Sequence, residues 1–272
     1  MIERAGRYLA THRRSRVARR VSAAVTRLYR SQSNLNYDMA SNGEQWTLRT
    51  LSALDDLDVL FDVGANHGEW SLAAKASFPD ASLHCFEIVP TTFRKLSETL
   101  AGMPRTTLNP CGLSDRDGEI EIFFDSELDF IATAVPGFSE EFHRNQTEKL
   151  RLPTMRGDEY CEQRAIDRIG FLKIDVEGHE PQVLRGFERM LDAGRIDALQ
   201  FEYGYVNIGV RFLLKDFYDY LAGFDMQVGK IFPNHVDFRP YRYWDEDFLG
   251  PNYVAVRSER PDVLSALKGR ER

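Results

Sequence analysis

The stretch LFDVGANHGEW, residues 60–70, decides the fold of this chain. Its apolar start is typical of a buried strand that carries one acid, Asp62, and it continues through Gly64 and Gly68 into a helical pattern. Such a turn places the helix N-terminus over a crevice at the carboxyl end of the strand. Glycines without a Cβ let a ligand approach the backbone closely. The spacing is G-x-x-x-G rather than the G-x-G-x-x-G of dinucleotide sites, so we expect a nucleoside-type cofactor without a pyrophosphate.

Strands and helices alternate through the rest of the chain, which predicts an α/β fold. The expected strands are residues 59–63, 82–89, 107–113, 119–124 (an edge strand), 169–176, 198–202, 226–232 and 252–257. The expected helices are residues 44–57, 68–78, 91–100 (N-capped by Thr91), 181–191 and 213–221. Residues 125–150 show no clear period, and we expect an insertion near the crevice there.

Charge is distributed unevenly along the chain. Residues 1–30 hold nine arginines and one acid, which gives this segment a charge of +8. The formal net charge of the chain is −7, so the remaining residues carry −15. Apolar side chains recur there at helical spacing: Val17, Val21, Ala24, Val25 and Leu28. A basic amphipathic helix of this kind can pack on its own domain, lie on an anionic membrane, dock on a partner or act as a transit peptide. The acidic remainder argues against nucleic acid as a partner.

The sequence predicts three parts: an Arg-rich helical extension and linker (residues 1–54), a cofactor-binding domain (55–258) and a C-terminal tail (259–272). No run approaches the roughly 18 apolar residues of a membrane span. The three cysteines, Cys85, Cys111 and Cys161, form no C-x-x-C pair, which favours a reducing compartment and argues against a zinc site. We expect a cytoplasmic protein whose membrane contact, if any, is peripheral, and the oligomeric state stays open.

Acids end four of the expected strands: Asp62, Glu87, Asp175 and Glu202. The carboxyl ends of parallel strands form one binding face, so we expect these acids to share a site. Glu87 follows the glycine turn by about 20 residues, where a carboxylate can accept both hydroxyls of a ribose. Asp62 either binds the amine side of the cofactor or braces the loop. Cys111, Gly112 and Leu113, at the end of the third expected strand, are placed to line an adenine.

The densest chemical stretch is KIDVEGHE, residues 173–180. It offers a general base, either His179 or Asp175, although His179 can also be structural and Glu180 can simply cap the next helix. Asp175 and Glu202 on neighbouring strand ends can jointly hold Mg²⁺ or another hard divalent cation through oxygen. The pattern is not H-E-x-x-H, which excludes a zinc protease of that type.

Four segments, in this order and spacing, resemble the FkbM family of S-adenosylmethionine (SAM)-dependent methyltransferases: FDVGANHGEW (61–70), CFEIVP (85–90), FLKIDVEGHEPQVLRG (171–186) and QFEYG (200–204). The resemblance covers about residues 55–257. It implies the class I, Rossmann-like methyltransferase fold: a doubly wound, seven-stranded, mostly parallel sheet with helices on both faces and the seventh strand antiparallel. It also implies SAM as cofactor and O-methylation, often of sugar hydroxyls in glycans, glycolipids or natural products.

Transferred residue by residue, the resemblance assigns the cofactor loop to Asp62, Gly64 and Gly68. We expect Asn66, within that loop, and Asp175 to bind the cofactor as well. Glu87 matches the ribose acid, and residues 175–180 match the segment that faces the reacting centre. The family supplies no assigned catalytic base, and it leaves the Arg-rich residues 1–54 unexplained.

Methyl transfer to an alcohol needs an acceptor oxygen held in line behind the methyl group and a base or metal that deals with its proton. We expect His179 or Asp175 to take that proton and Glu202 to orient the acceptor or a metal. Aromatic side chains of residues 203–205 and 232–248, edged with acids, suit a sugar or glycolipid acceptor. The alternatives are an N- or protein methyltransferase of the same fold and an inactive SAM-binding interaction protein.

Overall fold

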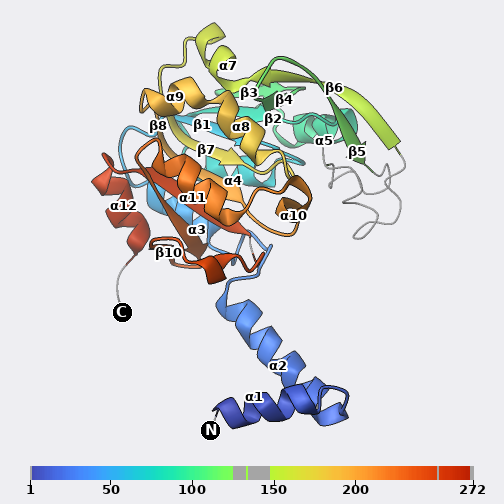
Figure 1. Ribbon diagram of the computed structural model, residues 1–272. Coiled ribbons are helices and arrows are strands. Elements are labelled where there is room, and N and C mark those ends of the chain that lie inside the picture. Colours follow the sequence, from blue (N-terminus) through green and yellow to red (C-terminus); the bar gives the residue numbers. More distant parts are fainter. Residues whose placement is uncertain (1, 125–132, 134–147, 250, 270–272) are drawn as a thin grey trace.

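The computed structural model describes residues 2–124, 133, 148–249 and 251–269. Its body is built on an eight-stranded sheet with the order β10-β9-β11-β8-β7-β1-β2-β3 (Figure 1). These strands are β1 (Val59–Val63), β2 (Ser82–Phe86), β3 (Thr106–Asn109), β7 (Ile169–Ile174), β8 (Ile196–Glu202), β9 (Met226–Phe232), β10 (His235–Phe238) and β11 (Asn252–Arg257). β11 runs antiparallel to both neighbours, β8 and β9, within an otherwise mostly parallel sheet. The predicted doubly wound α/β sheet with an inserted antiparallel strand is confirmed.

Helices cover both faces of this sheet, and each face has its own apolar core. One core takes side chains from α7 (Gly157–Gln163), α8 (Glu180–Gly186), α9 (Glu188–Asp192) and α11 (Leu214–Ala222). The other takes side chains from α3 (Glu44–Leu51), α4 (Glu69–Ser77), α5 (Pro90–Thr99) and α12 (Pro261–Lys268). In α11, for example, Leu214, Phe217 and Leu221 are buried at helical spacing. Two short helices, α10 (Val206–Val210) and η1 (Tyr243–Asp245), follow β8 and β10.

The strand predictions need three corrections. The sheet has eight strands rather than seven, because β10 folds back on β9 where we expect an aromatic loop. The third expected strand breaks at Pro110, which has no N–H to donate to a ladder. Its second half, β4 (Gly112–Ser114), belongs to a separate sheet of order β4-β6-β5. That sheet contains the expected edge strand as β5 (Gly118–Phe124) and an unpredicted strand, β6 (Glu148–Arg156).

The helix boundaries also differ from the predictions. α3 ends at Leu51, six residues before the expected end. α5 begins at Pro90 with Val89 as its N-cap, so the predicted cap at Thr91 is wrong. The helix expected over residues 181–191 is divided at Phe187 into α8 and α9. At that point Gly186 packs against the backbone of β4, where a Cβ would lie 2.1 Å from the Ser114 carbonyl oxygen.

The two ends of the chain hold more structure than a linker and a tail. Asn34 and Asn42 are buried within the expected polar linker, and α12 packs on α3 in the expected tail. The Arg-rich segment forms two helices, α1 (Ile2–Thr11) and α2 (Arg16–Gln32), which project from the body (Figure 1). No described helix is both long and apolar enough to cross a membrane. The insertion expected over residues 125–150 lies mostly outside the described residues.

Gly64 sets the distance between the two central strand ends. It follows β1 with a φ of +81°, and a Cβ at this position would lie 1.8 Å from the carbonyl oxygen of Asp175, the residue after β7. Only glycine permits both this conformation and this approach. The turn after β1 therefore rests directly on the end of β7.

We predict that Gly64→Ala lowers the free energy of unfolding by at least about 3 kcal/mol, since it adds both backbone strain and overlap with backbone atoms. Gly102→Ala is the matched control. Gly102 also has a positive φ, of +74°, but has nothing within 4 Å of the Cβ position. We therefore expect Gly102→Ala to lower the free energy of unfolding by only about 1–2 kcal/mol. Urea unfolding of the full chain measures both values. Equal losses would contradict the packing argument.

Candidate functional site

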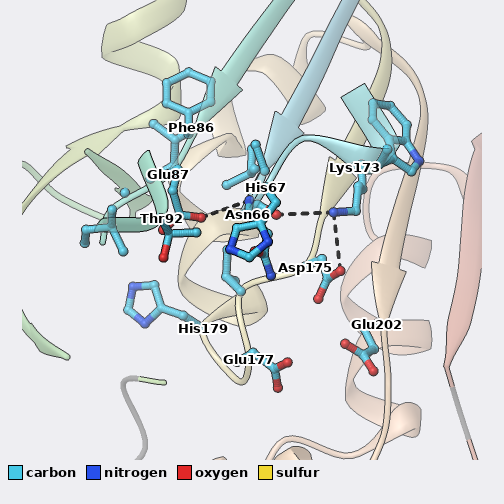
Figure 2. Close-up of a pocket in the computed structure, with 18 of the residues that line it drawn as sticks. Asn66, His67, Phe86, Glu87, Thr92, Lys173, Asp175, Glu177, His179 and Glu202 are labelled. Atoms are coloured by element: carbon cyan, nitrogen blue, oxygen red, sulfur yellow. Dashed lines mark hydrogen bonds and ion pairs between the residues drawn. The ribbon is translucent and has the colours of Figure 1, made fainter. Parts of the chain in front are cut away.

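A cavity of about 770 Å³ opens at the carboxyl ends of β1, β2, β7 and β8. Glu87, Asp175 and Glu202 line it, so three of the four strand-end acids meet there as predicted. Glu87 and Thr92 lie on one side, Asp175 and Glu202 lie on the other, and the glycine turn lies between them (Figure 2). The cavity has a size that is common for small-molecule sites.

The glycine turn forms the floor between the two sides. Gly64, Asn66 and Gly68 all have positive φ, of +81°, +49° and +89°. The backbone N–H of Asn66 donates to Glu87 Oε2 at 2.9 Å, which ties the turn to the end of β2. The sequence predicts that a ligand approaches the glycines closely. In the structure, a Cβ at Gly64 would overlap Asp175 and a Cβ at Gly68 would overlap Leu96, so protein atoms make the close approach. Protein packing and backbone conformation are thus sufficient reasons for both glycines.

Glu87 is buried and positioned by the backbone on both sides. Its Oε1 accepts the N–H of Val89 at 2.8 Å, in addition to the bond from Asn66. Burial raises the pKa of Glu87 to about 7, despite these two hydrogen bonds. The carboxylate lines the cavity in the place where the sequence predicts a ribose partner.

Asp62 lies beneath the turn and is fully buried, and it is not among the residues that line the cavity. Its carboxylate accepts the Ser71 hydroxyl at 2.6 Å and the Lys173 ammonium at 3.2 Å. Of the two roles left open by the sequence, this arrangement supports bracing of the loop.

Lys173 is a structural residue of the site that the strand pattern alone does not predict. Its Nζ lies 3.2 Å from Asp62, 3.3 Å from the Gly64 carbonyl oxygen and 3.3 Å from Asp175 Oδ2. Burial disfavours its charged form, but the carboxylates of Asp62, Asp175 and Glu44 outweigh burial and raise its pKa above the usual value. A lysine in the middle of an apolar strand sequence was the available signal, because a buried cation needs a partner.

Three carboxylates meet on the far side of the cavity from Glu87 (Figure 2). One oxygen each from Asp175, Glu177 and Glu202 lies within 4.8 Å of the others. Burial and the neighbouring Asp175 raise the pKa of Glu177 to about 8 and raise that of Glu202 well above its usual value. Glu177 has a φ of +51°, an unfavourable conformation of the kind found at functional sites.

His179 lines the cavity apart from this cluster, on the side of Glu87 (Figure 2). Burial lowers its pKa to about 4, so the ring is neutral at pH 7. Its Nε2 lies 2.9 Å from Ser114 Oγ, and that hydroxyl donates to Asp115. A hydroxyl has one proton, so Nε2 must be the donor to Ser114, which leaves Nδ1 as the acceptor of the ring.

Some of the remaining predicted residues line the cavity, and others stabilise the loops around it. Gly112 and Leu113 line the cavity together with Ile88, Ile120 and Ile122, whereas Cys111 is not among the lining residues. Glu180 accepts the N–H groups of Val176 and Gly178, so it caps the loop before α8, and burial raises its pKa to about 7.

Three lining residues come from the segment before the domain: Tyr37, Met39 and Glu44. The polar composition of residues 31–44 predicts a linker instead. Tyr37 is 62% exposed, but it lies near Glu202, Glu177 and Asp175, whose charges contribute to its raised pKa. The buried Glu44 accepts a hydrogen bond from Gln200 of β8 at 2.7 Å. This segment therefore forms part of the wall next to the carboxylates.

The model of the methyltransferase FkbM domain matches residues 62–228, more than half of the chain. The chain belongs to the FkbM methyltransferase family. With the strand order described above, it carries a class I SAM-dependent methyltransferase domain. A precorrin-6y C5,15-methyltransferase of Geobacter metallireducens aligns with a TM-score of 0.45 and 12% identity, over 79% of this chain and 87% of that one.

Curated relatives are methyltransferases of several kinds. The hexuronic acid methyltransferase AglP of Haloferax volcanii is 32% identical over 154 residues, which are 56% of this chain and 59% of that protein. The 31-O-demethyl-FK506 methyltransferase FkbM of Streptomyces tacrolimicus is 28% identical over 48% of this chain and 60% of its own length. The 2-O-methyltransferase NoeI of Sinorhizobium fredii is 25% identical over 50% and 60%. The chain spans about 60% of the length of the relatives it matches.

We predict that SAM binds more tightly as the pH rises from about 6 to 8, because Glu87, with a pKa of about 7, accepts hydroxyl hydrogen bonds more strongly when ionised. Glu87→Gln should lower the affinity for SAM by about ten- to a hundredfold and flatten this pH dependence. Titration calorimetry measures both effects, with Glu98→Gln on the exposed face of α5 as the control. Unchanged affinity in Glu87→Gln would remove the ribose assignment.

Proposed function

We propose that this protein transfers the methyl group of SAM to a hydroxyl oxygen of a sugar-like acceptor. The observation that carries the proposal is the division of one cavity between Glu87 and the glycine turn on one side and the Asp175–Glu177–Glu202 cluster on the other. The first side suits a nucleoside, and the second suits a polyol.

The cofactor side is supported by the residues around Glu87. Its carboxylate is available to ribose hydroxyls, while Leu113, Ile88 and Ile122 offer an apolar wall to an adenine. SAM supplies an electrophilic methyl group when bound. The turn at Asn66 and His67 lies between the two sides, where the methionine part of the cofactor would have to pass (Figure 2).

The acceptor side is supported by the combination of carboxylates and aromatic rings. Tyr37 and Tyr205 line the cavity with Glu177 and Glu202. Carboxylates accept hydrogen bonds from hydroxyl groups, and aromatic faces pack on the apolar faces of sugar rings. Because the cluster is acidic, a neutral sugar suits it better than a sugar acid. A hexuronic acid, named for one relative, would meet like charges here.

The same cluster is our candidate for the base. Groups with raised pKa are better proton acceptors when they are ionised, and three oxygens within 4.8 Å can share protons. Lys173 compensates the charge of Asp175 at 3.3 Å. We assign proton acceptance to Asp175 and Glu202 with Glu177, in preference to His179, which lies apart from the cluster and whose pKa is lowered by burial to about 4.

The cluster also fits a hard divalent cation, because its donors are all carboxylate oxygens from the ends of two neighbouring strands. Asp175, Glu177 and Glu202 would hold Mg²⁺, which would polarise the acceptor hydroxyl.

We predict that Glu202→Gln lowers kcat by about 10²- to 10⁴-fold, because it removes a proton acceptor from the cluster. The affinity for SAM should change less than about threefold, since Glu202 lies on the other side of the cavity. His179→Ala is the comparison, and we expect it to retain most of kcat. The reverse result, with kcat lost only in His179→Ala, would transfer the role of base to His179.

We predict that labelled methyl groups from SAM appear in a glycan or glycolipid fraction and not in protein. Among pure acceptors, neutral sugars should react faster than uronic acids, for the reason of charge given above. Product analysis after incubation with SAM labelled in its methyl group measures this, with and without a chelator to test for a cation. Label in protein would instead support a protein methyltransferase, and SAM binding without any transfer would support an inactive binding protein.

A further inference from the structure

The amphipathic helix α2 has an apolar face that the body does not cover. Four side chains of this face, Val17, Val21, Val25 and Leu28, are between 41% and 71% exposed. Their spacing places them on one stripe of the helix. The sequence left open whether this helix packs on its own domain, but within the described residues this stripe does not.

The rest of the helix is basic. Ser15 caps its start by accepting the N–H of Ala18, so the helix is well defined from its first turn. The helix carries five arginines, which lie opposite the stripe or on its flanks: Arg16, Arg19, Arg20, Arg27 and Arg30. α1 adds Arg4 and Arg7 on the other side of a short turn. The whole segment carries +8 against −15 for the remainder of the chain.

We propose that α1 and α2 dock on an anionic lipid surface, with the apolar stripe of α2 in the interface. Apolar side chains on one face and arginines on the other are the pattern that inserts at the boundary between headgroups and acyl chains. Each arginine near such a surface strengthens binding by about fivefold. The acidic body is repelled by the same surface, so the helices face it and the body points away.

A second copy of this chain is the competing occupant, and charge disfavours it. Two copies packed along their stripes would bring the arginines of both helices together, with only Glu3 in each copy to compensate. An anionic lipid surface can bury the apolar stripe and pair with the arginines at the same time.

The end of α2 is fixed to the body next to the cavity. Tyr29 donates its hydroxyl to Asp247 at 3.2 Å. Asn34 donates to the carbonyl oxygens of Asn42 and Ile231, at 2.7 and 2.9 Å. Tyr37, which lines the cavity, follows the end of the helix by five residues, a span of at most about 18 Å. Docking therefore brings the acceptor side of the cavity near the lipid, which, if the proposed function holds, suits a lipid-linked sugar.

The test is sedimentation of the full chain with vesicles of phosphatidylcholine alone or mixed with phosphatidylglycerol, without SAM or acceptor. We expect binding only to the anionic vesicles, weakened by salt. Leu28→Gln should lower the partition coefficient at least about tenfold, because it removes an apolar side chain from the interface. Thr26→Gln, on the exposed polar face, should leave it unchanged. Neither substitution alters charge or a buried residue.

Equal binding by the two variants, or equal binding to both kinds of vesicle, would overturn the proposal. A third result would also overturn it: wild-type protein that does not bind vesicles but forms a dimer in analytical ultracentrifugation, which Leu28→Gln converts to a monomer. The apolar stripe would then be the contact with a second copy. The assay contains no methyl donor or acceptor, so its failure leaves the proposed methyl transfer untouched.

Discussion

The buried ammonium of Lys173 is the interaction on which the site depends. It contacts Asp62 in β1, the Gly64 carbonyl oxygen in the turn and Asp175 beyond β7. A buried charge is tolerated only with such partners. Since Gly64 also touches the backbone of Asp175, charge and packing fix the same two strand ends. The floor of the cavity and the first member of the carboxylate cluster therefore have one common support.

Negative charge exceeds positive charge at this edge of the sheet. Lys173 contacts two carboxylates, Asp62 and Asp175. Among the described residues that line the cavity, Glu44, Glu177 and Glu202 are further acids. Burial raises the pKa of each of the three, to about 8 for Glu177, because a buried carboxylate is costly to ionise. A cavity of this character attracts a cationic ligand more strongly than a neutral one. A sulfonium donor is cationic before transfer and its thioether product is neutral, which favours exchange of product for fresh donor.

Much of the site could be predicted because the carboxyl ends of parallel strands meet at one edge of the sheet. The predictions that were wrong each have an identifiable cause. Glu87 and Asp175 lie one residue beyond their strands and reach the cavity. Asp62 lies one residue before the end of β1, so its side chain turns under the sheet edge instead. Pro110 breaks the third expected strand, but periodicity cannot reveal that its second half, β4, pairs with β6, a strand more than thirty residues later. Tyr37 reaches the cavity only because buried Asn34 and Asn42 anchor an aperiodic segment.

That segment has a consequence for how such a protein can diversify. The wall around Glu87 comes from within the matched domain, whereas Tyr37, Met39 and Glu44 come from before residue 62, where the family match begins. Substitutions at these three positions can reshape the neighbourhood of the carboxylates without disturbing Lys173 or the glycine turn. Under the proposed function, acceptor preference depends partly on residues outside the family match, so it can change while donor binding is preserved. The cavity is accordingly lined by more of the chain than the matched family domain.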